Sequence, residues 1–84
     1  MGTPTKYAFV DLETTGGSAQ YDRITEIAII RVEGENVTRY QSLINPQQHI
    51  SYFIESITGI SNAMVADEPE FAEVADEVWT WLQD

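Results

Sequence analysis

The sequence has no cysteine, few basic residues and no long apolar run. Without cysteine, neither disulfides nor thiolate metal sites can add to the stability of the fold. No apolar run approaches the roughly 20 residues that a membrane-spanning helix needs, and residues 1–6 lack the apolar segment of a signal peptide. These features predict a cytoplasmic protein without a membrane partner.

Basic side chains are outnumbered by acidic ones, four to fourteen, which gives a formal net charge of −10. A protein that holds nucleic acid over a broad surface neutralises phosphates with many Lys and Arg side chains. The sequence therefore excludes a broad surface of that kind. It still permits a site for the few nucleotides at a strand end, because divalent metals can supply positive charge there.

The chain is short, with 84 residues, and corresponds to one domain at most. At this size, folding removes only about 60% of the surface of the unfolded chain from water. We therefore expect a small core and low stability.

The first strand is predicted at Lys6–Glu13, just before a turn of Thr14, Thr15 and two glycines. Its two faces are both largely apolar, which is typical of a central strand covered on both sides. Side chains alternate along a strand, so Asp11 and Glu13 point to the same side. Their oxygens could share one hard cation such as Mg²⁺ or Mn²⁺. The alternative is an ordinary solvated strand end.

Two further strands are predicted at Ile24–Val32 and Val37–Ile44, joined by a four-residue hairpin connection over 33–36. The three strands would form an antiparallel meander. Glu26 is either a polar neighbour of the carboxylate site or an ordinary strand carboxylate, and we favour the second interpretation. His49 follows in a polar loop, where a solvated histidine is favoured over a general base.

Helical signals fill the second half of the chain. Ser51–Ile57 predicts a short helical turn, and Ser61 can cap a second one that reaches Met64. One long helix is predicted from the Pro69 turn to Gln83, capped by Asp67 or Glu68. Its apolar stripe should pack on the meander; the stripe consists of Phe71, Val74, Ala75, Val78 and Leu82. Trp79 and Trp81 cannot both face the sheet, so we expect at least one to be partly exposed.

The segment Phe9–Gly16, with the sequence Phe-Val-Asp-Leu-Glu-Thr-Thr-Gly, resembles the first motif of the DEDD family of 3′-5′ exonucleases. This is the DnaQ-like group, to which the proofreading epsilon subunit of bacterial DNA polymerase III belongs. Other segments resemble the family in the same order along the chain: Arg23–Ala28, Asn45-Pro46, Ile57–Ile60, Met64-Val65 and Pro69–Val74. The resemblance covers nearly the whole chain.

The resemblance implies an α/β fold, the N-terminal portion of a ribonuclease H-like fold. It consists of the three-stranded antiparallel meander, one long helix and short helical turns. Asp11 and Glu13 would be the catalytic metal ligands, and the complete domain would hold two Mg²⁺ or Mn²⁺ ions. The substrate implied is the 3′ end of single-stranded DNA or RNA. Five residues would contact the terminal nucleotide, namely Thr14, Thr15, Gly16, Ile60 and Met64. For Ile60 and Met64 the alternative is a place in the core, which we favour.

The main departure from the family is at the C-terminal side. The fourth strand, the second-motif aspartate, the His or Tyr general base and the last aspartate have no counterpart in residues 1–84. The chain is therefore predicted to be an incomplete exonuclease domain, inactive as a fragment, with an open edge at its first strand. A missing C-terminal half or a second copy could pair there. The alternatives are a non-catalytic fragment that binds a partner or itself, and an acidic structural domain without a ligand.

Overall fold

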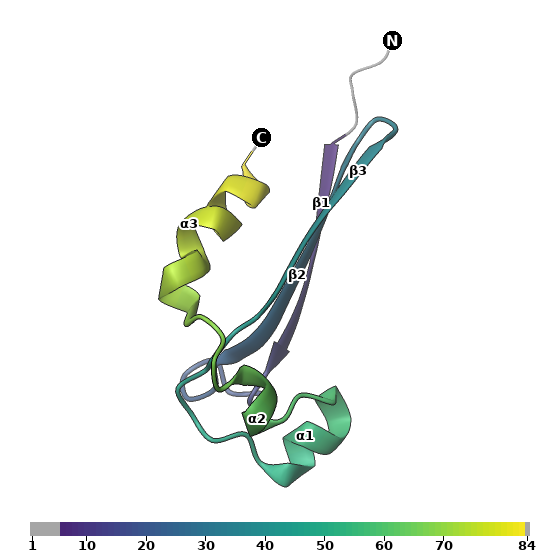
Figure 1. Ribbon diagram of the computed structural model, residues 1–84. Coiled ribbons are helices and arrows are strands. Elements are labelled where there is room, and N and C mark those ends of the chain that lie inside the picture. Colours follow the sequence, from purple (N-terminus) through teal and green to yellow (C-terminus); the bar gives the residue numbers. More distant parts are fainter. Residues whose placement is uncertain (1–5, 84) are drawn as a thin grey trace.

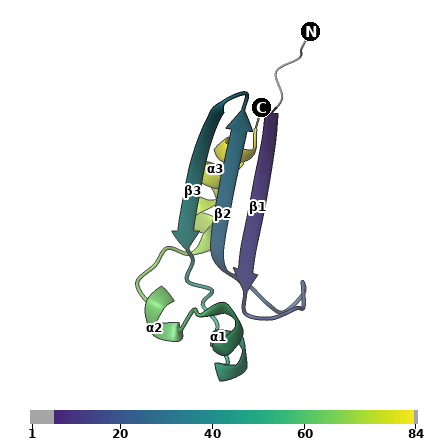
Figure 2. The same cartoon turned by 90° about the vertical axis from the view of Figure 1, so that its right-hand side faces the viewer.

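The computed structural model describes residues 6–83, so residues 1–5 and 84 of the predicted domain lie outside the described range. Three strands, β1 (Lys6–Thr14), β2 (Ile24–Glu33) and β3 (Asn36–Leu43), precede three helices, α1 (Tyr52–Thr58), α2 (Asn62–Val65) and α3 (Phe71–Leu82). The strands form one antiparallel sheet in the order β1-β2-β3 (Figures 1 and 2). The predicted meander, long helix and short helical turns are confirmed. Across residues 6–83, every helix is too short or too polar to span a bilayer.

The main core lies between α3 and one face of the sheet. Ile27 and Ile29 are two residues apart on β2, so both side chains lie on the face toward α3. They pack in one cluster with Val74 and Val78 of the helix. Ile29 is fully buried. At the far end of α3, Trp81 packs on Tyr40 of β3 with ring centroids 5.8 Å apart. Burial of the phenol and the neighbouring carboxylate of Glu77 raise the pKa of Tyr40.

A second, smaller core holds α1 and α2 below the strand ends (Figure 1). It consists of the buried side chains of Ile50, Ile60 and Val65. The Asn62 side chain fixes the loop that enters this unit, since its Oδ1 accepts from Ile50 N at 2.8 Å and its Nδ2 donates to Ile50 O at 2.9 Å. Ser61 caps α2 as predicted, by accepting from Met64 N at 3.2 Å.

In the described chain, β1 is an edge strand and not a central one. It pairs with β2 along one side, and its side chains remain accessible on both faces. Phe9 on one face is 58% exposed and Val10 on the other is 47% exposed. The apolar pattern on both faces is therefore not matched by burial in this structure, and the predicted open edge is present.

Helix α3 stands along one face of the sheet, and the opposite face carries no helix within residues 6–83 (Figure 2). We call this second surface the open face. It presents Tyr7, Phe9, Asp11 and Glu13 of β1 together with their partners on β2, because directly opposed residues of an antiparallel pair share a face. The candidate metal ligands therefore lie opposite the main core.

Two predicted boundaries were wrong. The hairpin connection contains two residues, because Glu33 and Asn36 already pair and only Gly34 and Glu35 form the turn. Gly34 has φ of 60°, a left-handed conformation that glycine adopts without strain and that allows the tight turn. Helix α3 begins after Glu70 and not at Pro69, because Glu70 is extended and its N–H donates to Glu73 Oε1 at 2.8 Å.

The apolar stripe of α3 is narrower than predicted. Val74 and Val78 are buried, whereas Phe71 and Leu82 at the two ends are exposed. The reason is geometric: α3 packs on a three-stranded sheet whose edge strand β1 makes no large contact with it. Trp79 is exposed while Trp81 packs on Tyr40, as their spacing predicted.

Candidate active site

The two carboxylates of the first motif lie side by side on the open face, near the end of β1. Asp11 pairs with Ala28 of β2, and Glu13 pairs with Glu26. Asp11 is exposed and Glu13 is half-buried. The strand alternation that predicted a shared face for Asp11 and Glu13 is thus present.

These two side chains fit a hard divalent cation by the chemistry of their donors. Each brings carboxylate oxygens, the ligands that Mg²⁺ and Mn²⁺ prefer, and the open face leaves room for water as further ligands. Within residues 6–83, no group of three or more His, Cys, Asp or Glu side chains is arranged to hold a metal. The described chain therefore offers part of a donor set.

A β-bulge shifts the register between β1 and β2 directly after Glu13. Glu13 faces Glu26, but the next residue, Thr14, faces Ile24, so Thr25 is an extra residue on β2. The bulge turns Ile24 toward the main core, where it packs against the buried cluster. Glu26 meanwhile keeps its place on the open face, and the acidic and apolar sides of the sheet end are separated.

The threonine turn after β1 is held by its own hydrogen bonds. Thr14 Oγ1 donates to Gly16 O at 2.6 Å. Thr15 is buried; its N–H donates to Arg23 O at 2.9 Å and its Oγ1 accepts from Arg23 N at 3.0 Å. The structure thus engages both hydroxyls within the loop, and the predicted contact of Thr14, Thr15 and Gly16 with a nucleotide stays a prediction.

Asp22 closes the loop from the other side. Its carboxylate accepts from Ser18 N at 2.8 Å and lies 3.0 Å from Thr15 Oγ1. A Cβ atom on Gly16 would come within 2.6 Å of the same carboxylate, so only glycine fits at Gly16 without displacing Asp22. The close approach gives a physical reason for the glycine that ends the first motif.

Gln48 links this loop to the one that follows β3. Its Oε1 accepts from Thr15 Oγ1 at 2.6 Å, and its Nε2 donates to Tyr21 O at 2.7 Å. The sequence analysis missed Gln48 because a lone glutamine in a polar loop has no spacing pattern to identify it. The contact depends on the return of the chain 33 residues after Thr15.

We expect Gln48→Ala to loosen the loop at the end of β1, whereas the neighbouring Gln47→Ala should not. The first change removes two side-chain hydrogen bonds and leaves the buried Thr15 hydroxyl without its nearest acceptor, a loss of about 1–3 kcal/mol. Urea unfolding and hydrogen exchange at the Asp22 amide, which donates to Ser18 O, would measure the effect. Equal behaviour of the two variants would contradict the bridging role of Gln48.

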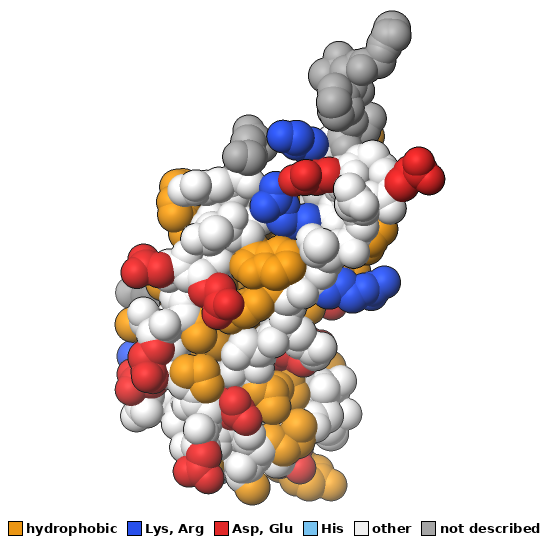
Figure 3. All heavy atoms as spheres, turned by 45° about the horizontal axis from the view of Figure 1, so that its top comes forward, with side chains coloured by type: hydrophobic (Ala, Val, Ile, Leu, Met, Phe, Trp, Pro, Cys, Tyr) orange, Lys and Arg blue, Asp and Glu red, His pale blue; other side chains and the backbone are white. Residues whose placement is uncertain are grey.

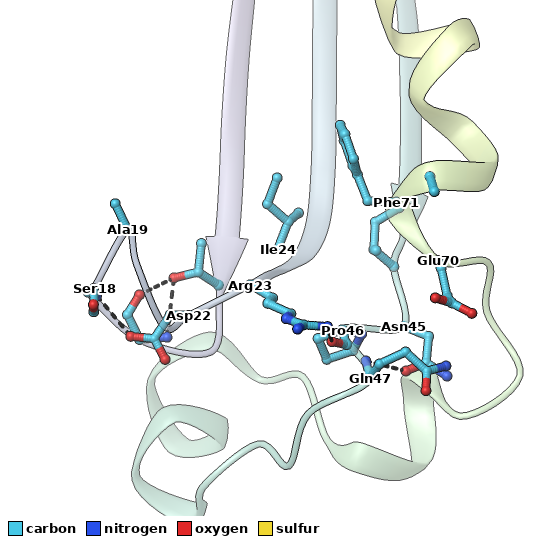
Figure 4. Close-up of a pocket in the computed structure, with 15 residues that line it drawn as sticks. Ser18, Ala19, Asp22, Arg23, Ile24, Asn45, Pro46, Gln47, Glu70 and Phe71 are labelled. Atoms are coloured by element: carbon cyan, nitrogen blue, oxygen red, sulfur yellow. Dashed lines mark hydrogen bonds between the residues drawn. The ribbon is translucent and has the colours of Figure 1, made fainter.

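A cavity of about 650 Å³ opens beside this loop, between residues 16–23, the segment 44–47 and the start of α3 (Figure 4). Ile24, Ile44 and Phe71 give it an apolar side, and Arg23 extends across it to donate from Nη1 to Pro46 O at 3.3 Å. Thr14 and Gly16 line it, but Asp11 and Glu13 do not. The cavity therefore lies on the α3 side of the sheet end, away from the carboxylate pair.

The two apolar residues predicted near the terminal bases have different environments. Ile60 is only 4% exposed and belongs to the second core cluster, which agrees with the core alternative. Met64 is exposed, and its sulfur accepts from Ser61 N at 3.4 Å. Of the two, Met64 has the side chain accessible to a ligand. His49 is exposed in its loop.

The charged side chains follow the composition. In Figure 3 the basic side chains form separate groups, mainly toward the upper part of the molecule, among acidic and apolar ones. The face in that view has no continuous basic track for a nucleic-acid backbone. Any attraction for phosphates at the carboxylate pair would have to come from bound cations.

Comparison with known proteins gives a consistent result. A model of the exonuclease family, RNase_T, matches residues 8–84. The chain is 40% identical over 79 residues to DNA polymerase III PolC-type of Staphylococcus saprophyticus, covering 93% of the chain and 6% of that protein. It is 43% identical over 79 residues to the 3′-5′ exonuclease DinG of Bacillus subtilis, covering 92% of the chain and 8% of that protein.

Solved structures agree with the sequence relatives. Exonuclease X, in complex with 5′ overhanging duplex DNA, has a TM-score of 0.74 and 30% identity, over 84% of this chain and 42% of that one. The nuclease domain of 3′hExo, a DEDDh family member bound to rAMP, has a TM-score of 0.72 and 23% identity, over 92% and 43% of the two chains. The second likeness concerns the fold alone, and it confirms the ribonuclease H-like architecture. The chain belongs to the exonuclease family of the DEDD 3′-5′ type.

Proposed function

We propose that this chain is the N-terminal segment of a metal-dependent 3′-5′ exonuclease domain that acts on the 3′ ends of single-stranded DNA or RNA. The observation that carries the proposal is the shared position of Asp11 and Glu13 on the open face, at the end of β1. Exonuclease X is recorded with DNA, and the nuclease domain of 3′hExo with a ribonucleotide, which supports a nucleic-acid substrate. The chain spans only 6% of the length of the PolC-type polymerase and 8% of the length of DinG.

In this proposal Asp11 and Glu13 hold Mg²⁺ or Mn²⁺ through their carboxylate oxygens. Bound cations would supply the positive charge that this acidic chain lacks and would help water to attack a phosphodiester. Thr14, Thr15 and Gly16 shape the loop beside the terminal nucleotide, and Met64 offers an exposed apolar side chain to its base. Ile60 lies in the second core cluster with Ile50 and Val65, and would act there by supporting the fold.

We further propose that residues 1–84 are an incomplete domain, carrying the first motif only. A two-metal site needs more ligands than the two carboxylates on β1, and the described residues contain no third ligand in position. The open edge of β1 supports the same view, since an exposed strand with apolar side chains on both faces is a pairing site. A C-terminal half of the domain is the partner we favour for that edge.

A second candidate function rests on the same edge. If another copy or another protein pairs with β1, the chain acts as a non-catalytic binding or self-associating fragment. The exposed Tyr7, Phe9, Val10 and Leu12 favour this alternative. Sedimentation would separate the two: a concentration-dependent dimer supports the alternative, and a monomer at all concentrations excludes self-association.

The metal site is tested by Asp11→Ala. We expect the chain to bind Mn²⁺ weakly and Asp11→Ala to abolish binding, because a site with only two protein ligands cannot lose one. Calorimetry or Mn²⁺ relaxation of water would measure both proteins. Asp76→Ala, which removes an exposed carboxylate on α3, is the matched control and should bind as the parent chain does. Equal binding by Asp11→Ala and the parent chain would refute the assignment.

A further inference from the structure

A third carboxylate, Glu26, lies directly beside the candidate metal pair. It is the antiparallel partner of Glu13, so the two side chains leave the open face at neighbouring positions. Directly opposed side chains have Cβ atoms about 4.5–5.5 Å apart. The bulge lies beyond this pair, with Thr25 as the extra residue, so Glu13 and Glu26 stay in the regular register.

The Glu26 carboxylate is held on the side away from β1. Gln41 of β3 pairs with Ala28 and donates from Nε2 to Glu26 Oε2. Because β3 lies across β2 from β1, this bond draws one oxygen of Glu26 away from Glu13. Glu26 is thus arranged as a neighbouring charge and not as a third ligand, in agreement with the absence of a three-ligand group in residues 6–83.

Two like charges directly opposed on a sheet destabilise it, so the Glu13–Glu26 pair costs the metal-free fold some stability. Among the paired residues of the open face, the basic side chain is Arg39 of β3, opposite Ile30 and four residues along β2 from Glu26. A divalent cation at Asp11 and Glu13 would reverse the sign of the interaction, since Glu26 would then face a positive charge. The charge of Glu26 would therefore lower the stability of the metal-free chain and raise its affinity for the cation.

We infer that Glu26 strengthens cation binding at Asp11 and Glu13 through its charge, without coordinating the metal, and that it does so at the expense of the stability of the metal-free chain. The inference rests on the proposed metal site. It replaces the interpretation of Glu26 as an ordinary strand carboxylate. Gln41 is the residue that fixes the position of the charge.

The test compares Glu26→Gln with Glu35→Gln. Both remove one negative charge, but Glu35 lies in the hairpin turn at the far end of the sheet (Figure 1). Glutamine keeps the length of the side chain and an oxygen that can accept from Gln41. We expect Glu26→Gln to lower the affinity for Mn²⁺ about three- to tenfold at low salt, because it removes a negative charge that acts on the ion through water. The loss should be smaller at high salt, because salt screens this interaction. Glu35→Gln should leave the affinity unchanged.

The second readout is unfolding by urea in the presence of EDTA. Glu26→Gln should raise the midpoint of the metal-free chain, so that stability and affinity change in opposite directions. A merely structural role of Glu26 would lower both. If Glu26→Gln and Glu35→Gln bind Mn²⁺ equally while Asp11→Ala does not bind, the inference is overturned and the metal site stands. If the parent chain and Asp11→Ala behave alike toward Mn²⁺, the proposed site fails, and the inference with it.

Discussion

At most a trace of nucleotide is expected to be released when the purified 84-residue chain is incubated with a 3′-labelled oligonucleotide and Mg²⁺ or Mn²⁺. In-line attack on a phosphodiester uses two metals about 3.5–4 Å apart, together with a base that activates water. Asp11 and Glu13 supply two carboxylates, and His49 is exposed in a loop after β3. Without the second metal and the base, the transition state loses several kcal/mol of stabilisation. At about 1.4 kcal/mol per factor of ten, this loss lowers the rate about a thousandfold or more.

The matched protein in this assay is the chain extended by the C-terminal half of the domain, with and without EDTA. We expect the extended protein to degrade single-stranded 3′ ends in an EDTA-sensitive reaction. Asp11→Ala in the extended protein should lose the activity and serves as the control for contaminating nucleases. Robust, EDTA-sensitive cleavage by the 84-residue chain itself would contradict this expectation. It would mean that a second copy, or His49 and further acidic side chains of the same chain, completes the site.

Ile29→Ala is expected to unfold the chain. Ile29 is fully buried in the middle of β2 and belongs to the cluster that joins the sheet to α3. Truncating a buried isoleucine to alanine costs about 2–5 kcal/mol. Small domains have total stabilities toward the lower end of the usual range of about 5–15 kcal/mol, so this single loss can exceed the reserve.

Circular dichroism during urea and thermal unfolding would measure the effect. Ile57→Ala is the matched control, because it removes the same atoms from a side chain on α1 that is 64% exposed. The control should unfold close to the parent chain. A cooperative transition of unchanged midpoint in Ile29→Ala would show that the cluster between β2 and α3 does not hold the fold together.

Much of the fold could be predicted because the signals are local. The alternation along Lys6–Thr14 and the β-branched run of β2 identify strands, and Ser61 identifies the start of α2. The same alternation placed Asp11 and Glu13 on one face. The family resemblance added the order of elements and the role of the pair, and the comparisons confirmed the family.

What sequence reasoning missed depends on contacts between distant segments. Burial of Thr15 and its bond to Gln48 arise only when the loop after β3 folds back on the end of β1. The start of α3 is a local exception: Glu70 N donates to Glu73 Oε1 there, whereas the Pro69 signal suggested an earlier turn. Phe71 and Leu82 have helical spacing like Val74, but the sheet beneath them is too narrow to bury them.

The direction of the strands has one more consequence. β1 and β3 run the same way, and α3 returns along the covered face to finish beside the beginning of β1, where Gln83 and Lys6 line the same small cavity (Figure 2). A connection from β3 through α3 to a further parallel strand is right-handed in nearly all proteins. With α3 on this face, a right-handed crossover leads past β2 and ends outside β1. The handedness of the chain thus directs any strand that follows α3 to the edge next to Asp11 and Glu13, where it would run parallel to β1 and bring its own end to the same corner of the open face.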